Sequence, residues 1–263
     1  MLHRVDLTPM SLESYRPLIG EEATTRLREL SARVHGVRIV HINATPYGGG
    51  VSELLRSEVA LLLGLGLHVD WQVIAGDTHF FEVTKGIHNA LQGGRYTLAH
   101  EAQEIYLHNS AANAGRLEDG YDVYIVHDPQ PAAIRHFRAS ARGRWRCHID
   151  TSQPNPEVAE FLAPYLEPYD AFIFTMESFV LPSLRRKRLR IIPPGIDPLS
   201  PKNIGLPADV CERIVTWHGV DRRRPLLLQV SRFDPWKDPF GVLRVYRAVR
   251  EVVPGLQLAL LGS

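Results

Sequence analysis

Two polar residues, His127 and Asp128, directly follow an apolar run in the segment VYIVHDPQP. An imidazole can donate a hydrogen bond to a hydroxyl group, and a carboxylate can accept from two hydroxyl groups at once. This pair at the end of an expected strand therefore predicts a site for a hydroxyl-rich ligand such as a sugar. The alternative interpretation is that Asp128 caps a short helix that begins near Pro129.

Three consecutive glycines, Gly48, Gly49 and Gly50, separate another apolar run from a helix-like pattern. Glycine lets the backbone approach a ligand closely, and the first turn of a helix offers free N–H groups to an anion. The segment has neither the G-x-G-x-x-G spacing nor the lysine of a P-loop, which disfavours a nucleoside triphosphatase. We expect an anionic ligand here, and the alternative is a plain strand-to-helix turn with a capping residue.

A basic pair, Arg232 and Lys237, lies in the segment SRFDPWKD after a further apolar run. Arginine offers a two-pronged fork to phosphate, and lysine offers a point charge. Placed five residues apart across a turn, the two cations are suited to hold one diphosphate from two sides. Such cations offset the charge that develops when a nucleoside diphosphate leaves. The alternative is an ordinary basic loop.

These residues need a scaffold that brings several strand ends together. Apolar runs that alternate with helical patterns indicate a parallel sheet covered on both faces. We therefore expect an α/β fold, a doubly wound Rossmann-like sheet, with the polar residues at the carboxyl ends of its strands. The expected strands are residues 38–43, 69–76, 121–129, 145–150, 170–176 and 189–195, and the clearest helices are 80–91, 97–114 and 156–166.

A change of character after residue 195 suggests a second domain. A proline-rich connection and a helix-like stretch precede a new strand, a helix and the apolar run LQLALLGS. We assign residues 1–215 to an N-terminal domain with its linker, and residues 216–263 to the start of a second Rossmann-like domain. A lone β-α-β unit leaves apolar faces in water. We therefore expect the rest of that domain to be missing, and the exposed face either to form a homodimer or to be poorly ordered.

Composition narrows the class of protein. The 30 Lys and Arg residues balance 29 Asp and Glu residues, which gives no electrostatic basis for binding nucleic acid. The two cysteines and 12 histidines show no metal-ligand spacing, so we expect no bound metal and interpret the histidines as surface or core residues. We find no signal peptide and no apolar run long enough for a membrane helix, so we expect a cytoplasmic protein without a membrane partner.

The motifs together resemble a known family. SRFDPWKDP after an apolar strand resembles the donor-phosphate loop of retaining GT-B glycosyltransferases. Within that family, HINATPYGGGVSELL, VDWQVIAGDTHFFEVTKGIHNALQG, VHDPQP and CHIDTSQPN are similar to the trehalose synthase branch, which joins a nucleotide-activated glucose to glucose. The resemblance extends from about Val37 to Ser263. A trehalose phosphorylase of the same branch remains an alternative, and so does a non-catalytic sugar-binding or assembly module.

The resemblance implies a donor and an acceptor for the reaction. The donor is a nucleoside-diphosphate glucose, the acceptor is glucose, the product is trehalose, and the anomeric configuration is retained without a required cofactor. On the donor side, the residues implied are Gly48, Gly49, Gly50 and His127 for phosphate and sugar, and Arg232 and Lys237 for the diphosphate. The expected catalytic set, drawn from the donor and acceptor residues, is His127, Asp128, Arg232 and Lys237.

On the acceptor side, the resemblance implies Asp128 together with Lys85, His88 and Asn89. The last three share one helix face, because their spacing is i, i+3, i+4. The family's E-x7-E motif, which binds the donor sugar and ribose, has no counterpart in residues 1–263. This difference predicts that the nucleoside pocket is mostly absent and that the chain alone is an inactive fragment.

Overall fold

The computed structural model describes residues 2–138, 142–185 and 187–262. The chain divides into two compact units, Met1–Ser200 and Pro201–Ser263. The boundary expected between residues 215 and 216 falls inside helix α7 (Ala208–Trp217), which belongs to the second unit. None of the helices in the described part of the chain is both long and apolar enough to cross a bilayer.

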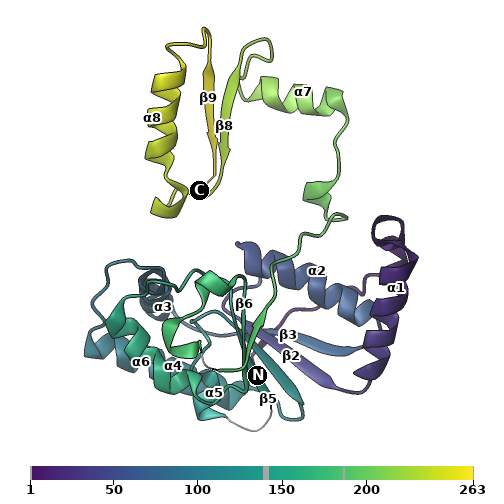
Figure 1. Ribbon diagram of the computed structural model, residues 1–263, viewed down its shortest axis with the longest axis vertical. Helices are drawn as coiled ribbons and strands as arrows, with labels where there is room; N and C mark the ends of the chain where they lie inside the picture. Colours follow the sequence, from purple (N-terminus) through teal and green to yellow (C-terminus); the bar gives the residue numbers. More distant parts are fainter. Residues whose placement is uncertain (1, 139–141, 186, 263) are drawn as a thin grey trace. The chain divides into compact units, whose positions relative to one another are not determined.

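Seven strands of the first unit form one sheet in the order β1-β3-β2-β4-β5-β6-β7 (Figure 1). The strands are β1 (His3–Arg4), β2 (Arg38–Asn43), β3 (His68–Val73), β4 (Val123–His127), β5 (Arg142–Cys147), β6 (Ala171–Phe174) and β7 (Leu189–Ile191). Strands β2 to β7 run parallel to their neighbours, and the short β1 is antiparallel to β3. The mostly parallel sheet confirms the doubly wound α/β class.

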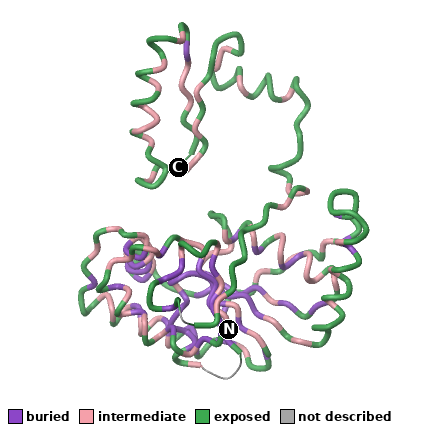
Figure 2. The backbone as a smooth tube through the Cα atoms, in the orientation of Figure 1, coloured by how far each residue is buried: buried purple, intermediate pink, exposed green. Residues whose placement is uncertain are grey.

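Helices cover both faces of this sheet (Figure 1). On one face, α2 (Gly50–Gly64) packs Leu55 and Val59 against Trp71 and its neighbours. On the other face, a larger core holds α3 (Thr78–Leu91), α4 (His100–Arg116), α5 (Ile134–Phe137) and α6 (Pro156–Leu166). The central strands between these layers are largely buried, as Figure 2 shows, and β2, β4 and β6 are accordingly largely apolar in sequence, whereas β5 carries three arginines.

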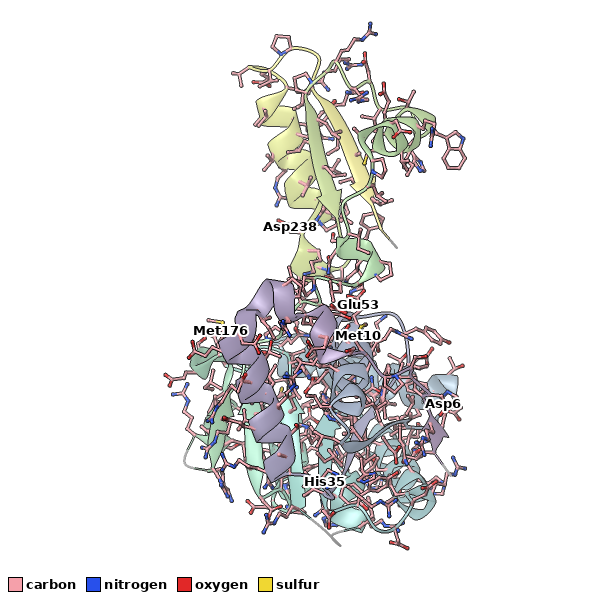
Figure 3. All side chains as sticks on the ribbon, turned by 90° about the vertical axis from the view of Figure 1, so that its right-hand side faces the viewer. Asp6, Met10, His35, Glu53, Met176 and Asp238 are labelled. Atoms are coloured by element: carbon pink, nitrogen blue, oxygen red, sulfur yellow. The ribbon has the colours of Figure 1, made fainter. Side chains whose placement is uncertain are left out.

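The two ends of the first unit are fastened together. The Tyr15 hydroxyl donates to Oδ1 of Asp197 at 3.0 Å, and the Ser57 hydroxyl donates to Oδ2 at 2.8 Å. Nearby, the backbone N–H of Met10 donates to a carbonyl of α2 at 2.8 Å, and Figure 3 shows Met10 beside the helices. A Cβ at Gly64 would lie 1.8 Å from the Met10 carbonyl oxygen, so only glycine permits this approach. Helix α1 (Arg16–Arg33) lies between these contacts in the chain and was not predicted.

The second unit consists of α7 and one β-α-β element. Strands β8 (Leu226–Val230) and β9 (Gln257–Leu261) pair in parallel, and α8 (Pro239–Val249) connects them. Asp238, labelled in Figure 3, caps α8 by accepting a hydrogen bond from the backbone of Gly241 at 2.8 Å. Apolar side chains of this unit are exposed, including Leu228 at 55% and Val230 at 66%. A two-stranded sheet with one connecting helix leaves such faces in water.

Candidate functional site

The sheet order creates a switch point between β2 and β4. From β2 the chain moves to β3 on one side, and it later returns to place β4 on the other side of β2. Ligands of doubly wound sheets bind beyond the carboxyl ends of the strands at such a point. The glycine loop follows β2, and the pair His127 and Asp128 lies at the end of β4. The structure thus brings two of the predicted groups to one edge of the sheet.

Buried side chains anchor the glycine loop to the sheet. Asn43 ends β2, accepts a hydrogen bond from Trp71 Nε1 at 2.8 Å, and donates through Nδ2 to the carbonyl of Thr45 at 2.7 Å. The Ser52 hydroxyl donates to the same carbonyl at 2.7 Å. These bonds fix the start of the loop relative to the switch point.

The loop itself depends on glycine. Gly48 and Gly49 have φ values of 73° and 139°, in the region that side-chain-bearing residues rarely adopt. Gly49 is the N-cap of α2 and, lacking a side chain, leaves the first turn of the helix without a side-chain cap. The backbone N–H groups of that turn are therefore suited to an anion, as the sequence predicts for Gly48, Gly49 and Gly50.

Three imidazoles form a hydrogen-bonded column beside the switch point. His41 Nδ1 lies 3.0 Å from His127 Nε2, and His127 Nδ1 lies 2.9 Å from His148 Nε2. Adjacent rings have centroids 5.3 Å apart in both pairs. His41 lies on β2, His127 ends β4, and His148 follows β5, so the column crosses three neighbouring strands. We call these three residues the histidine column.

The histidine column is held in its neutral form. Burial lowers the pKa of His41 to about 4 and that of His148 to about 3, and it lowers the pKa of His127 well below its usual value. The positive charge of Arg146 adds to the effect on the pKa of each ring. Near neutral pH, each imidazole therefore carries one N–H group and one bare nitrogen.

Arg146 brings its charge to the column with a partner. Its guanidinium lies 3.1 Å from a carboxylate oxygen of Glu58 on α2, and the two side chains are 9% and 31% exposed. The pair is partly buried, so water screens it less than a surface pair. The Glu58 carboxylate supplies the counter-charge that allows Arg146 to lie beneath α2, next to three neutral histidines.

Asp128 is held in an unusual backbone conformation. Its φ is 62°, in the left-handed region that few residues other than glycine adopt. Its carboxylate accepts a hydrogen bond from the backbone N–H of His148 at 2.8 Å, and its carbonyl accepts one from Trp145 Nε1 at 2.9 Å. The following helix, α5, begins later and has Ala133 as its N-cap. The strained residue is therefore fixed by the neighbouring strand β5, and not by a role as helix cap.

The carboxyl group of Asp128 is poised near neutrality. Burial raises its pKa to about 7, against the opposing effects of the His148 N–H and the Arg146 charge. The side chain is buried, with the residue 8% exposed. Groups with such shifts at a strand end are typical of functional sites.

His41 and His148 were not predicted as members of this site. His127 is 1% exposed, and both of its ring nitrogens face other histidines. His148 is half-buried and follows β5 as Asp128 follows β4, so it is the imidazole of the column nearest to solvent. The sequence signal for His148 was its position directly after WRC. The expected strand extended to residue 150, so His148 was assigned to the strand and not to the site at its end.

The predicted acceptor residues form a second group, on α3. Lys85 is exposed, and His88 and Asn89 are half-buried. His88 Nδ1 lies 3.2 Å from the Gln92 amide nitrogen one turn later. The end of α3 meets the segment that follows β5, because the backbone N–H of Asn155 donates to the carbonyl of Ala90 at 2.8 Å. This end of α3 therefore lies against the segment that follows β5 and begins with His148.

The basic pair belongs to the second unit. The Arg232 guanidinium forms an ion pair with Asp234 at 2.7 Å, and its side chain is 70% exposed. Asp234 also accepts from the backbone N–H of Lys237 at 3.2 Å, which shapes the turn between the two cations. Lys237 lines a hollow of about 530 Å³ between β8 and α8. Within the ranges that the structure describes, no cluster of His, Cys, Asp and Glu side chains is arranged to hold a metal ion.

Comparison with known proteins gives consistent matches. A family model described as "Trehalose synthase, N-terminal domain" matches residues 41–181. A trehalose synthase from Rubrobacter xylanophilus is 48% identical over 270 residues, which cover 100% of this chain and 65% of that protein. A trehalose synthase from Pyrococcus horikoshii is 45% identical over 95% of this chain and 61% of its own length. The chain thus spans less than two thirds of the length of these relatives.

Solved structures with the same fold are more distant in sequence. A trehalose-6-phosphate synthase, OtsA, matches with a TM-score of 0.60 and 16% identity over 86% of this chain and 65% of that chain. A UDP-forming trehalose-phosphate synthase from Burkholderia xenovorans matches with a TM-score of 0.63 and 17% identity over 86% and 64%. These similarities show the GT-B type of fold.

Proposed function

This chain belongs to the trehalose synthase family, by its N-terminal domain, and from that premise we propose that it forms the acceptor side of a retaining glucosyltransferase. The enzyme moves glucose from a nucleoside-diphosphate glucose to glucose and forms trehalose. The observation that carries the proposal is the hydrogen bond from the backbone N–H of His148 to the Asp128 carboxylate, which holds the residue after β5 next to the end of β4. A carboxylate and an imidazole on neighbouring strand ends match the donor and acceptor capacity of sugar hydroxyls.

Each group of site residues has its own role in binding the two substrates. Asp128 and the α3 group of Lys85, His88 and Asn89 hold the acceptor glucose, and His148 with His127 behind it holds the donor sugar. The first turn of α2 receives negative charge through its N–H groups. Arg232 and Lys237 bind the diphosphate and offset the charge that builds on it as it departs, so no metal cofactor is required.

The reaction balances without another reactant. The bond between glucose C1 and the phosphate oxygen breaks, and a bond from C1 to the acceptor hydroxyl oxygen forms on the same face. The hydroxyl proton passes to the departing diphosphate, which serves as base. The protein supplies orientation, and its cations stabilise the leaving group. A homodimer through the exposed β8–β9 face and a cytoplasmic location remain predictions.

Calorimetry with glucose tests the acceptor side directly. We expect the wild-type chain to bind glucose, and we expect Asp128→Ala and Lys85→Ala each to weaken binding by at least about tenfold, because a charge-assisted hydrogen bond contributes roughly 1.5–3 kcal/mol. Asp6→Ala is the matched control, since the Asp6 side chain is 94% exposed and lies at the surface of the first unit (Figure 3). Glucose binding that survives both site substitutions contradicts the acceptor assignment.

Turnover assays separate the alternatives. Incubation of the full-length parent with glucose and a nucleotide-activated glucose should release nucleoside diphosphate and disaccharide. Release of glucose 1-phosphate from trehalose that depends on orthophosphate would instead identify a phosphorylase. Glucose binding without either reaction would leave a sugar-binding module as the function of this chain.

A further inference from the structure

The histidine column has one closed end and one open end. At the closed end, His41 is 1% exposed, and its Nε2 is buried without a hydrogen-bond partner among the described residues. At the open end, His148 is half-buried and follows β5 at the edge of the sheet. His127 lies between them with both nitrogens engaged. A buried ring nitrogen without a partner is rare enough to require an explanation.

Counting protons leaves two arrangements for the column. Each neutral ring has one N–H, and each of the two inter-ring contacts needs one proton, so the choice at His127 sets both neighbours. In the first arrangement, all three rings carry the proton on Nδ1, and His148 directs an N–H outward. In the second, all three carry it on Nε2, and His41 buries an N–H that no acceptor meets. Every ring therefore has the same tautomer.

The closed end decides between the two arrangements. A buried N–H without an acceptor is the rarer and costlier defect, whereas the first arrangement leaves only a bare ring nitrogen in the core. Glu58 would attract a proton toward His41, but its carboxylate already pairs with Arg146 at 3.1 Å, so the two opposite charges largely cancel. The first arrangement is therefore favoured.

We propose that His127, seated on His41, is a positioning residue that fixes His148 as the Nδ1–H tautomer. His148 then offers its Nδ1–H as a hydrogen-bond donor to a hydroxyl oxygen, next to the end of β4 that carries Asp128. Naming a sugar hydroxyl as the ligand rests on the proposed function, whereas the tautomer itself does not. His41 acts from the core, two strands away from the residue that it controls.

Two-bond ¹H–¹⁵N spectra of the ¹⁵N-histidine-labelled chain at pH 8 test the proposal. We expect His148 to show a protonated Nδ1 and a bare Nε2, and exposed His79 serves as an internal reference for the Nε2–H form that free histidine prefers. His127→Phe keeps an aromatic ring in the column and removes both ring nitrogens, so His148 should change to the Nε2–H form. An Nε2–H form of His148 in the wild type, or an unchanged Nδ1–H form in His127→Phe, would overturn the proposal.

A second variant covers the case in which His127→Phe does not fold. His41→Asn places an amide near the position of Nδ1 that can either donate to His127 or accept from it. We expect two populations of His148 tautomers, and a single Nδ1–H population would refute control from the closed end. Glucose calorimetry on the same samples keeps the two ideas apart. The predicted tautomers without glucose binding would reject the proposed function and leave the column intact.

Discussion

Asp128→Asn isolates the free-energy cost of keeping a carboxylate at the end of β4. Asparagine tolerates the left-handed backbone at this position, and its amide oxygen can still accept from the His148 N–H. The substitution therefore removes the ionisation and little else. Because burial raises the folded pKa from 3.8 to about 7, the folded state retains a proton that the unfolded state has already released.

The sign and size of the effect follow from that shift. The stability contributed by a raised pKa is complete below pH 3.8 and is lost as pH rises through about 7. Between pH 5 and the folded pKa lie about two pH units, each equivalent to about 1.36 kcal/mol, and above that pKa the loss levels off. We therefore expect the advantage of Asp128→Asn over wild type to grow by roughly 2–3 kcal/mol between pH 5 and pH 9.

Urea unfolding at pH 5, 7 and 9 measures this difference. The histidine column titrates in both proteins, so its contribution cancels when the variant is compared with wild type. Asp6→Asn removes a carboxylate whose side chain is 94% exposed, and its difference from wild type should stay constant across the series. A difference for Asp128→Asn that is also flat between pH 5 and pH 9 would show that Asp128 ionises normally and refute the reasoning.

Three further outcomes are expected, each measured by urea unfolding. Gly49→Ala should lower the free energy of unfolding by about 1–3 kcal/mol, because φ at this position is 139°. Gly50→Ala, with open space at its Cβ, should stay within about 1 kcal/mol of wild type. Equal effects of the two substitutions would contradict the strain argument. The free energy of unfolding should fall as pH drops from 6.5 toward 4. The pKa values of His41 and His148 are lowered in the folded state, so only the unfolded chain gains those protons in this range. An unchanged stability between pH 6.5 and pH 4 would count against the buried neutral column. Trp71→Phe should cost at least about 1–3 kcal/mol by leaving Asn43 Oδ1 without its donor, and a smaller loss would mean that water replaces the indole.

The strand and helix pattern could be predicted where burial imposes it on both sides. Helix α6 has the predicted bounds, because Asn155 caps it, Pro156 begins it and a regular apolar face lines it. Helix α1 was missed because only Thr24 is buried along its 18 residues, so tertiary packing leaves no periodic trace in the sequence. Strand β5 begins earlier than expected, at Arg142, because Arg144 pairs with Asp170, a partner that only the folded chain provides.

The candidate site was predictable in part for the same reason. Asp128 and the glycine loop could be predicted because each directly follows an apolar strand in the chain. The histidine column does not, because it depends on the order in which β2, β4 and β5 lie side by side. The pairings of His41 with Ile125 and of His127 with Arg146 set which side chains share a face, and no local pattern encodes that register.

The hydrogen bond between Tyr15 and Asp197 bears on where the first unit can be truncated. The family match covers residues 41–181, and both partners of that contact lie outside it. A fragment trimmed to the matched range would keep most of the sheet and lose both halves of the fastening. The segment that leads out of the first unit is anchored by residues near the opposite terminus of the chain. The smallest piece suited to independent expression therefore begins before residue 10 and ends beyond residue 197.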